Sequence, residues 1–164
     1  MTASNAPQLI VDGEVERACS LSAADLALLP AEHQIADVSQ IEPKRMGRGV
    51  WLSGLLQTAR ARPTATHVTL HASADDFHAS VPLAEVADRA FLIYGVDEGA
   101  AMGALPTTAG GPFRFFIRDH AACQAAEVDE CANVKFVDRI ELTAGPGQDN
   151  RPHDEAEHAK LHEK

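Results

Sequence analysis

The sequence predicts an α+β fold that is mainly β. Short apolar runs typical of strands recur at irregular spacing, helical patterns are few and short, and the helices do not alternate regularly with the strands. The last observation argues against a doubly wound parallel sheet. At 164 residues, with 45% hydrophobic but only 5% aromatic residues, the chain suits one domain with a largely aliphatic core.

The charge balance makes some classes of partner poor candidates. The formal net charge is −10, from 24 acidic and 14 basic side chains, and such a surface repels phosphate backbones and anionic lipids. We therefore expect neither nucleic acid nor a membrane as a partner, although a local basic pocket for a small anion stays compatible with this charge. No apolar run approaches the roughly 20 residues of a membrane span. Residues 1–8 lack the pattern of a secretory signal, and the cysteine count of 3 is odd, so we expect a cytoplasmic location.

The first predicted elements are a hairpin and a short helix. Residues 1–8 are expected to form a flexible leader. Residues 9–11 and 14–17 flank Asp12-Gly13, a two-residue turn signal, and together predict a β-hairpin. Ser22 is a candidate N-cap for a helix through Leu29, which Pro30 ends. The apolar residues expected to face inward from this helix are Leu26, Leu28 and Leu29.

A basic loop separates the next two elements. Residues 35–38 predict a strand, and residues 50–61 predict a helix with an apolar stripe formed by Leu52, Leu55, Leu56 and Ala59. Residues 40–49 between them contain a proline, two glycines and three basic residues, namely Lys44, Arg45 and Arg48. This stretch is predicted to be an electropositive loop.

Strands dominate the rest of the chain. They are predicted at residues 67–72, 77–81, 91–94 and 113–117, followed by a well-alternating stretch at residues 134–142. Pro82 begins a short helix, and residues 97–99 form a turn. Residues 119–133 form an insertion, and residues 144–164 form a charged tail that contains histidines. The predicted domain therefore spans residues 9–143.

Two cations in late strands are candidate ligand-binding residues. Gly110-Gly111-Pro112 precedes a strand in which Arg114 has apolar neighbours, and the glycines allow the backbone to approach a ligand closely. A guanidinium in such a place usually has an anionic partner. The alternative is that Arg114 faces solvent from an edge strand. Lys135 raises the same question, because alternation also fits a polar outer face there.

An ordered series of segments resembles the sulfite-oxidase-type molybdopterin-binding domain along roughly residues 9–143. The series comprises Leu9-Ile10-Val11-Asp12-Gly13-Glu14-Val15, Gly49-Val50-Trp51-Leu52, Asp76-Phe77 with Ser80-Val81-Pro82-Leu83, Leu92-Ile93-Tyr94, Gly110-Gly111-Pro112-Phe113-Arg114, and Val134-Lys135-Phe136-Val137. The resemblance implies a sulfite-oxidase-type α+β fold that holds an anionic pterin dithiolene with a terminal phosphate. It places Arg114 and Lys135 in the cofactor pocket beside Gly110 and Gly111, and the basic loop with Arg45 and Arg48 could add to it.

The sequence departs from this family at its catalytic centre. Family members hold molybdenum through a cysteine thiolate, a soft ligand, in the loop before the Gly-Val-x-Leu segment. Here that loop has no cysteine, and Ser39 lies about where one would fall. Ala109 stands where other members carry a cofactor-binding histidine, and the tryptophan often found before Gly49 is missing.

A second candidate site is a zinc site in the insertion. His120, Cys123 and Cys131 could supply three zinc ligands, with Asp129 or a tail histidine as the fourth. The spacing is not that of a standard zinc ribbon, and a disulfide or two free thiols is the alternative. In the tail, His158 and His162 would share one face of a helix, which is a spacing that chelates divalent metals.

Three functions remain open on the sequence. The first is a molybdopterin-dependent oxidoreductase domain whose partner is a small anionic cofactor. The second is a catalytically inactive relative that acts as a binding or accessory module, since the cysteine is absent. The third is a small metal-binding protein. A partner subunit cannot be named from the sequence.

Overall fold

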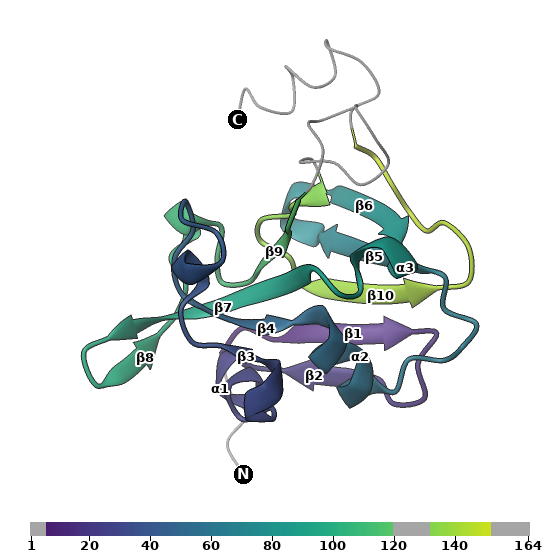
Figure 1. The fold of residues 1–164 in the computed structure, drawn as a ribbon. Coiled ribbons are helices and arrows are strands. Elements are labelled where there is room, and N and C mark those ends of the chain that lie inside the picture. The colour runs from purple at the N-terminus through teal and green to yellow at the C-terminus, as the bar shows by residue number, and fades with distance from the viewer. Residues whose placement is uncertain (1–5, 120–131, 152–164) are drawn as a thin grey trace.

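The computed structural model describes residues 6–119 and 132–151, which form two five-stranded sheets and three short helices (Figure 1). The first sheet has the order β2-β1-β10-β5-β6. Its strands are β1 (Leu9–Gly13), β2 (Cys19–Leu21), β5 (His67–Ala72), β6 (Phe77–Pro82) and β10 (Arg139–Thr143). β1 and β10 pair in parallel, whereas the other neighbours are antiparallel. The two ends of the domain therefore lie side by side in one sheet.

The second sheet has the order β3-β4-β7-β8, and β9 also pairs with β7. Its strands are β3 (Gln34–Ile35), β4 (Arg48–Trp51), β7 (Ala90–Glu98), β8 (Ala101–Gly103) and β9 (Arg114–Ile117). Central position explains the continuous apolar run of β7, because residues 90–96 are covered on both faces. The β7–β8 hairpin extends beyond the body of the domain (Figure 1).

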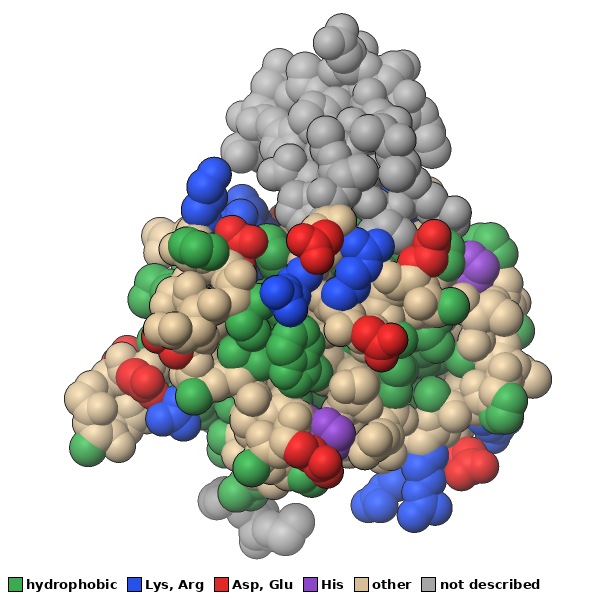
Figure 2. All heavy atoms as spheres, viewed as in Figure 1, with side chains coloured by type: hydrophobic (Ala, Val, Ile, Leu, Met, Phe, Trp, Pro, Cys, Tyr) green, Lys and Arg blue, Asp and Glu red, His purple; other side chains and the backbone are tan. Residues whose placement is uncertain are grey.

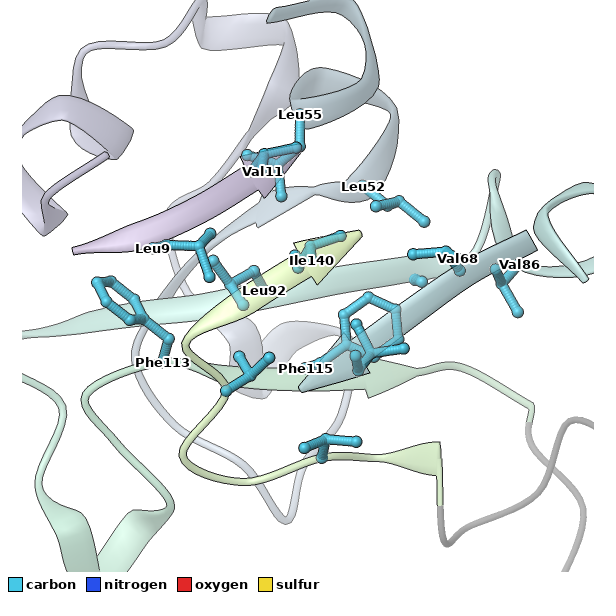
Figure 3. Close-up of a cluster of buried hydrophobic side chains, with 14 of the residues drawn as sticks. Leu9, Val11, Leu52, Leu55, Val68, Val86, Leu92, Phe113, Phe115 and Ile140 are labelled. Atoms are coloured by element: carbon cyan, nitrogen blue, oxygen red, sulfur yellow. The ribbon is translucent and has the colours of Figure 1, made fainter. Parts of the chain in front are cut away.

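The main hydrophobic core lies between the two sheets. Leu9, Val11 and Ile140 from the first sheet meet Leu92 and Phe115 from the second, as Figure 3 shows. Helices α2 (Leu52–Ala59) and α3 (Leu83–Val86) add further apolar side chains. A second, smaller cluster lies on the opposite face of β7 and includes Ile35, Val38, Phe91, Ile93, Val96, Leu105 and Phe116. Since both faces of this sheet are covered, a charged residue on β9 has to lie near apolar neighbours.

Several predicted elements are confirmed. Ser22 caps α1 (Ala23–Ala27) through a capping box in which its hydroxyl accepts a hydrogen bond from the amide of Asp25, and the carboxylate of Asp25 accepts one from the amide of Ser22. The strands at β5, β6 and β9 and the helix after Pro82 also lie where the sequence predicts them. β7 includes the strand predicted at residues 91–94 but continues to Glu98, so two residues of the turn predicted at 97–99 belong to the strand. The prediction for Leu28 is wrong, because this side chain is 83% exposed while Leu26 is fully buried. The helix has only five residues, and it presents one side to the core.

A hairpin does form at the predicted place, but Asp12-Gly13 is not its turn. β1 continues through Asp12 and Gly13 beside β10, and its antiparallel partner is Cys19–Leu21 rather than residues 14–17. The backbone amides of Glu16 and Arg17 instead bind the carbonyls of Arg60 and Ala59 at the end of α2. The connection therefore docks on a helix instead of closing a two-residue turn.

Three other boundaries differ from the prediction. The predicted helix at residues 50–61 begins only at Leu52, because residues 48–51 pair with β7 as strand β4. The predicted strand at residues 35–38 is confined to β3, since Val38 starts a single 3-10 turn. The alternating stretch at residues 134–142 forms a strand only from Arg139, and Phe136 has a φ of 57°, which interrupts an extended strand.

On the face shown in Figure 2, acidic and basic side chains are interspersed, and hydrophobic side chains gather near the middle. Within the described ranges, no helix combines the length and apolar character needed to cross a bilayer.

Candidate anion-binding site

Arg114 is a buried cation that lacks a counterion among the described residues. It stands opposite Ile93 of β7, so its side chain lies on the same face of the sheet as the second apolar cluster. The residue is 8% exposed, and its Nη1 donates to the carbonyl of Ala109 at 3.0 Å. Its Nε is buried and has no hydrogen-bond partner among the residues that the structure describes. The solvent-facing alternative for Arg114 does not agree with this burial.

Arg45 brings a second guanidinium to the same region. Its Cζ lies 5.5 Å from the ring centroid of Phe116, over the aromatic face. Its Nε is also buried without a partner. Burial, and then the charge of Arg45, lowers the pKa of Arg114 to about 10. Two cations that repel each other, each with an unused donor, form a site that favours an anion.

Gly110 lies close to the side chains of both Arg114 and Lys135. Gly110 has a φ of +93°, and a methyl group added there would lie 3.0 Å from Cδ of Arg114 and 3.1 Å from Cγ of Lys135. The amide of Phe136 donates to the carbonyl of Gly110 at 2.8 Å, which holds the two segments together. Lys135 is exposed, and its stem passes close to the buried arginine. The structure thus brings together four of the predicted residues, namely Gly110, Arg114, Lys135 and Arg45.

Gly111 and Arg48 have other environments. A side chain at Gly111 would collide with the carbonyl of Leu105, so close packing alone requires this glycine. Nε of Arg48 donates to Oδ1 of Asp97 at 2.6 Å. The charge of Arg48 is therefore already balanced within the chain, in contrast to that of Arg114.

Ser39 is engaged in hydrogen bonds within a local turn. Its hydroxyl donates to Oδ1 of Asp37 at 2.6 Å, and its amide donates to the same oxygen at 3.0 Å. These two hydrogen bonds lower the pKa of Asp37. Since the hydroxyl is neutral and already engaged, the arrangement does not fit a metal ligand at this position.

The zinc hypothesis concerns residues outside the described part of the chain. His120, Cys123 and Cys131 lie there, as do His158 and His162 of the tail. Within the described ranges, no group of three or more His, Cys, Asp or Glu residues is arranged to hold a metal ion. Cys19 is partly buried and packs against the main core as a small hydrophobic residue.

The sequence reasoning missed Phe116 as the platform under Arg45. Alternation along β9 places Phe116 and Arg114 on one face, since they are two residues apart. That spacing was available in the sequence. The contact with Arg45 was not, because it joins residues 71 positions apart along the chain.

The comparisons with known proteins concern the family and the fold of the chain. Residues 3–150 match the family model described as the oxidoreductase molybdopterin binding domain. The fold is similar to that of the sulfane dehydrogenase SoxCD from Paracoccus pantotrophus, with a TM-score of 0.61 and 18% sequence identity over 89% of this chain. This chain covers 40% of that chain's length. A search of curated proteins finds no match.

The family match covers residues 3–150, and the structural match covers 89% of this chain. The molybdopterin-binding fold predicted from the ordered segments is therefore confirmed. This protein belongs to the oxidoreductase molybdopterin binding domain family and has a sulfite-oxidase-type fold.

Proposed function

We propose that this domain binds the anionic pterin cofactor through Arg114, Arg45 and Lys135, at the turn formed by Gly110. The observation that carries the proposal is the pair of guanidinium groups whose buried Nε atoms have no partner among the described residues. Leaving such a donor unsatisfied costs about 1–3 kcal/mol, and the cost is removed when an oxygen of a ligand accepts the bond. Planar, multiply donating guanidinium groups suit phosphate and pterin oxygens.

Each residue has a separate role in this proposal. Arg114 is fixed by its bond to Ala109 and points its remaining donors at the ligand. Arg45 is held on the Phe116 ring and adds the second positive charge. Lys135, exposed at the rim, neutralises charge near solvent. Because Gly110 has no side chain, the side chains of Arg114 and Lys135 can both lie close to its backbone. Arg48, already bound to Asp97, is expected to contribute little.

The metal-binding part of the cofactor fits less well. A molybdenum-loaded pterin supplies oxygen-atom or electron transfer when it is bound, but Ser39 is engaged with Asp37 and does not supply a thiolate. We therefore assign no catalytic residue. The same observation favours a second candidate function, in which the domain binds the pterin as a binding or accessory module without a metal ligand of its own.

Protein purified from a host that makes the cofactor tests both candidates. Pterin is released oxidatively and measured by fluorescence, and molybdenum and zinc are measured by elemental analysis. Near-equal pterin and molybdenum support an oxidoreductase domain, whereas pterin without molybdenum supports the binding module. Absence of pterin contradicts both, and zinc alone favours the metal-binding alternative.

A matched pair of variants tests the site itself. Arg114→Ala is expected to lower the retained pterin at least tenfold, because a charge-assisted bond is worth about 1.5–3 kcal/mol. Arg48→Ala, which removes a cation bound to Asp97, is expected to retain the wild-type amount. Equal retention by the two variants would place the cofactor elsewhere.

A further inference from the structure

Two histidines on the outer face of the first sheet have no role in the proposed cofactor site. His71 of β5 and His78 of β6 are directly cross-strand, and they are 5% and 8% exposed. Their Nδ1 atoms lie 2.7 Å apart, with the ring planes at 70° to each other. This distance is that of a hydrogen bond between the two rings.

The outer nitrogen of each ring meets a carboxylate. Nε2 of His71 lies 3.0 Å from Oε1 of Glu141, and Nε2 of His78 lies 3.0 Å from Oδ1 of Asp76. Glu141 is held in place by Arg139, which also binds Asp12 on β1. A continuous polar row therefore crosses four strands of the sheet, from β1 to β6.

Counting protons along the row fixes its charge. Three hydrogen bonds are involved: His71 donates to Glu141, one ring donates to the other, and His78 donates to Asp76. Together they require three protons on the two rings. Two neutral imidazoles carry only two. When all three bonds form, the pair therefore holds one extra proton and a charge of +1.

Losing a proton and gaining one have unequal consequences. If the extra proton leaves, the bonds to Glu141 and between the rings persist, and only the contact with Asp76, whose side chain is 90% exposed, is lost. If a further proton is added, both Nδ1 atoms become donors and face each other at 2.7 Å in a buried site. Acid therefore breaks the central bond, whereas base removes only a peripheral contact.

His78 is also an attachment point for residues 145–151, which we call the strap. The His78 amide donates to the Asn150 side chain at 2.7 Å, and the Asn150 amide donates back to the His78 carbonyl at 2.9 Å. The neighbouring bonds of the strap are from Gly147 to the Ser80 hydroxyl and from the Ser80 amide to Asp149. The strap runs along β6, so a displacement of the His78 backbone strains the two hydrogen bonds that hold Asn150.

We propose that His71 and His78 share one proton and that a second added proton breaks the pair and releases the strap from β6 in mildly acidic solution. Histidine is the side chain that ordinarily titrates between about pH 5 and 8. The proposal goes beyond cofactor binding and does not depend on it.

The ionisable groups around the pair are of both signs. They are Asp75 and Asp76 in the β5–β6 turn, Asp138, Arg139 and Glu141 at β10, Asp12 on β1, His67 on β5, and Asp149 and Arg151 in the strap. Among these groups, Asp149 is the one whose protonation would most directly weaken the strap, because it accepts a hydrogen bond from the Ser80 amide of β6. Burial raises the pKa of Asp149, but the hydrogen bonds from Arg151 and from the Ser80 amide together outweigh it, so the pKa lies below the ordinary 3.8. Asp149 therefore stays charged throughout mildly acidic solution.

Nitrogen NMR of the wild-type rings tests the shared proton without any variant. We expect the two Nδ1 signals at pH 7 to show one hydrogen-bonded proton between them, and this signature to disappear by about pH 5. Two independent neutral rings that titrate separately would overturn the proposal. Loss of the ring signature on adding a chelator at constant pH would also overturn it, because a metal ion would then be the bridge.

Amide hydrogen exchange between pH 5 and 7.5, corrected for intrinsic rates, tests the release. We expect the protection factors of the Gly147 and Asn150 amides to fall at least tenfold between pH 7.5 and pH 5, relative to those of the amides that pair β5 with β10. The double variant His71→Gln, His78→Gln is expected to show no such dependence, whereas His67→Gln, on the same strand, should keep it. The proposal is contradicted if protection of the strap amides does not depend on pH in the wild type, or if the double variant keeps the pH dependence of the wild type.

Discussion

Replacing Arg114 by methionine is expected to stabilise the cofactor-free domain. Burial lowers the pKa of Arg114 to about 10, which means that folding disfavours the charged guanidinium by roughly 3 kcal/mol. Methionine removes this penalty but loses the bond to Ala109, worth about 1.5–3 kcal/mol. The expected net gain is about 1 kcal/mol, or a rise in Tm of roughly 2–4 °C for a domain of this size.

The pH dependence of this gain follows from the direction of the pKa shift. The folded pKa lies below the unfolded one, so the penalty on wild-type Arg114 is complete below about pH 10 and disappears as the pH rises towards the pKa of the unfolded chain. The gain of the methionine variant is therefore fully present at pH 7. Chemical denaturation of the cofactor-free proteins at pH 7 measures it.

Two comparisons make the result decisive. Arg48→Met removes a half-exposed ion pair to Asp97 and is expected to change the free energy of unfolding by less than about 1 kcal/mol. With cofactor bound, the order of stability should reverse, because wild-type Arg114 then has an anionic partner. If Arg114→Met destabilises the cofactor-free domain by more than about 1 kcal/mol, then Arg114 is already well satisfied, and the argument for an anion site fails.

Three further perturbations test other parts of the structure. Gly110→Ala forces a side chain into a positive φ and against Arg114, and is expected to cost about 1–3 kcal/mol and to lower pterin retention, measured by fluorescence. Leu92→Ala opens a cavity between the sheets and is expected to cost about 2–5 kcal/mol in chemical denaturation, whereas Leu28→Ala, at an exposed position, should stay within about 0.5 kcal/mol. Asp149→Asn is expected to lower stability at pH 7. The lowered pKa of Asp149 means that this contribution is present above pH 3.8 and is lost as the pH falls below it, so the two proteins should converge in strong acid during denaturation titrations.

Arg114 is buried without a counterion among the described residues. Arg48 shows the opposite arrangement, since Asp97 balances its charge in the absence of any ligand. Both arginines begin a strand, but Arg114 is 8% exposed whereas the side chain of Arg48 is 41% exposed.

The elements that were predicted correctly depend on short-range chemistry. The capping box of α1 needs only Ser22 and Asp25, and the apolar run of β7 reflects burial on both faces of one strand. The same local reasoning failed at residues 50 and 51. An apolar stripe continues there, but pairing with β7 recruits these residues into β4. Local propensity was overridden by a neighbouring strand.

The sequence by itself determined the α+β class, most strands and the presence of cations beside a glycine turn. Only the tertiary structure decided which neighbours each of these cations has. It placed Arg45 on Phe116 and Lys135 beside Gly110, bound Arg48 to Asp97, and joined Arg139 to Asp12 across 127 positions of the chain. The physical reason is that periodicity and turn chemistry act between neighbours in sequence. The charge balance of a buried group depends on neighbours in space, and these are set when β1 and β10 pair.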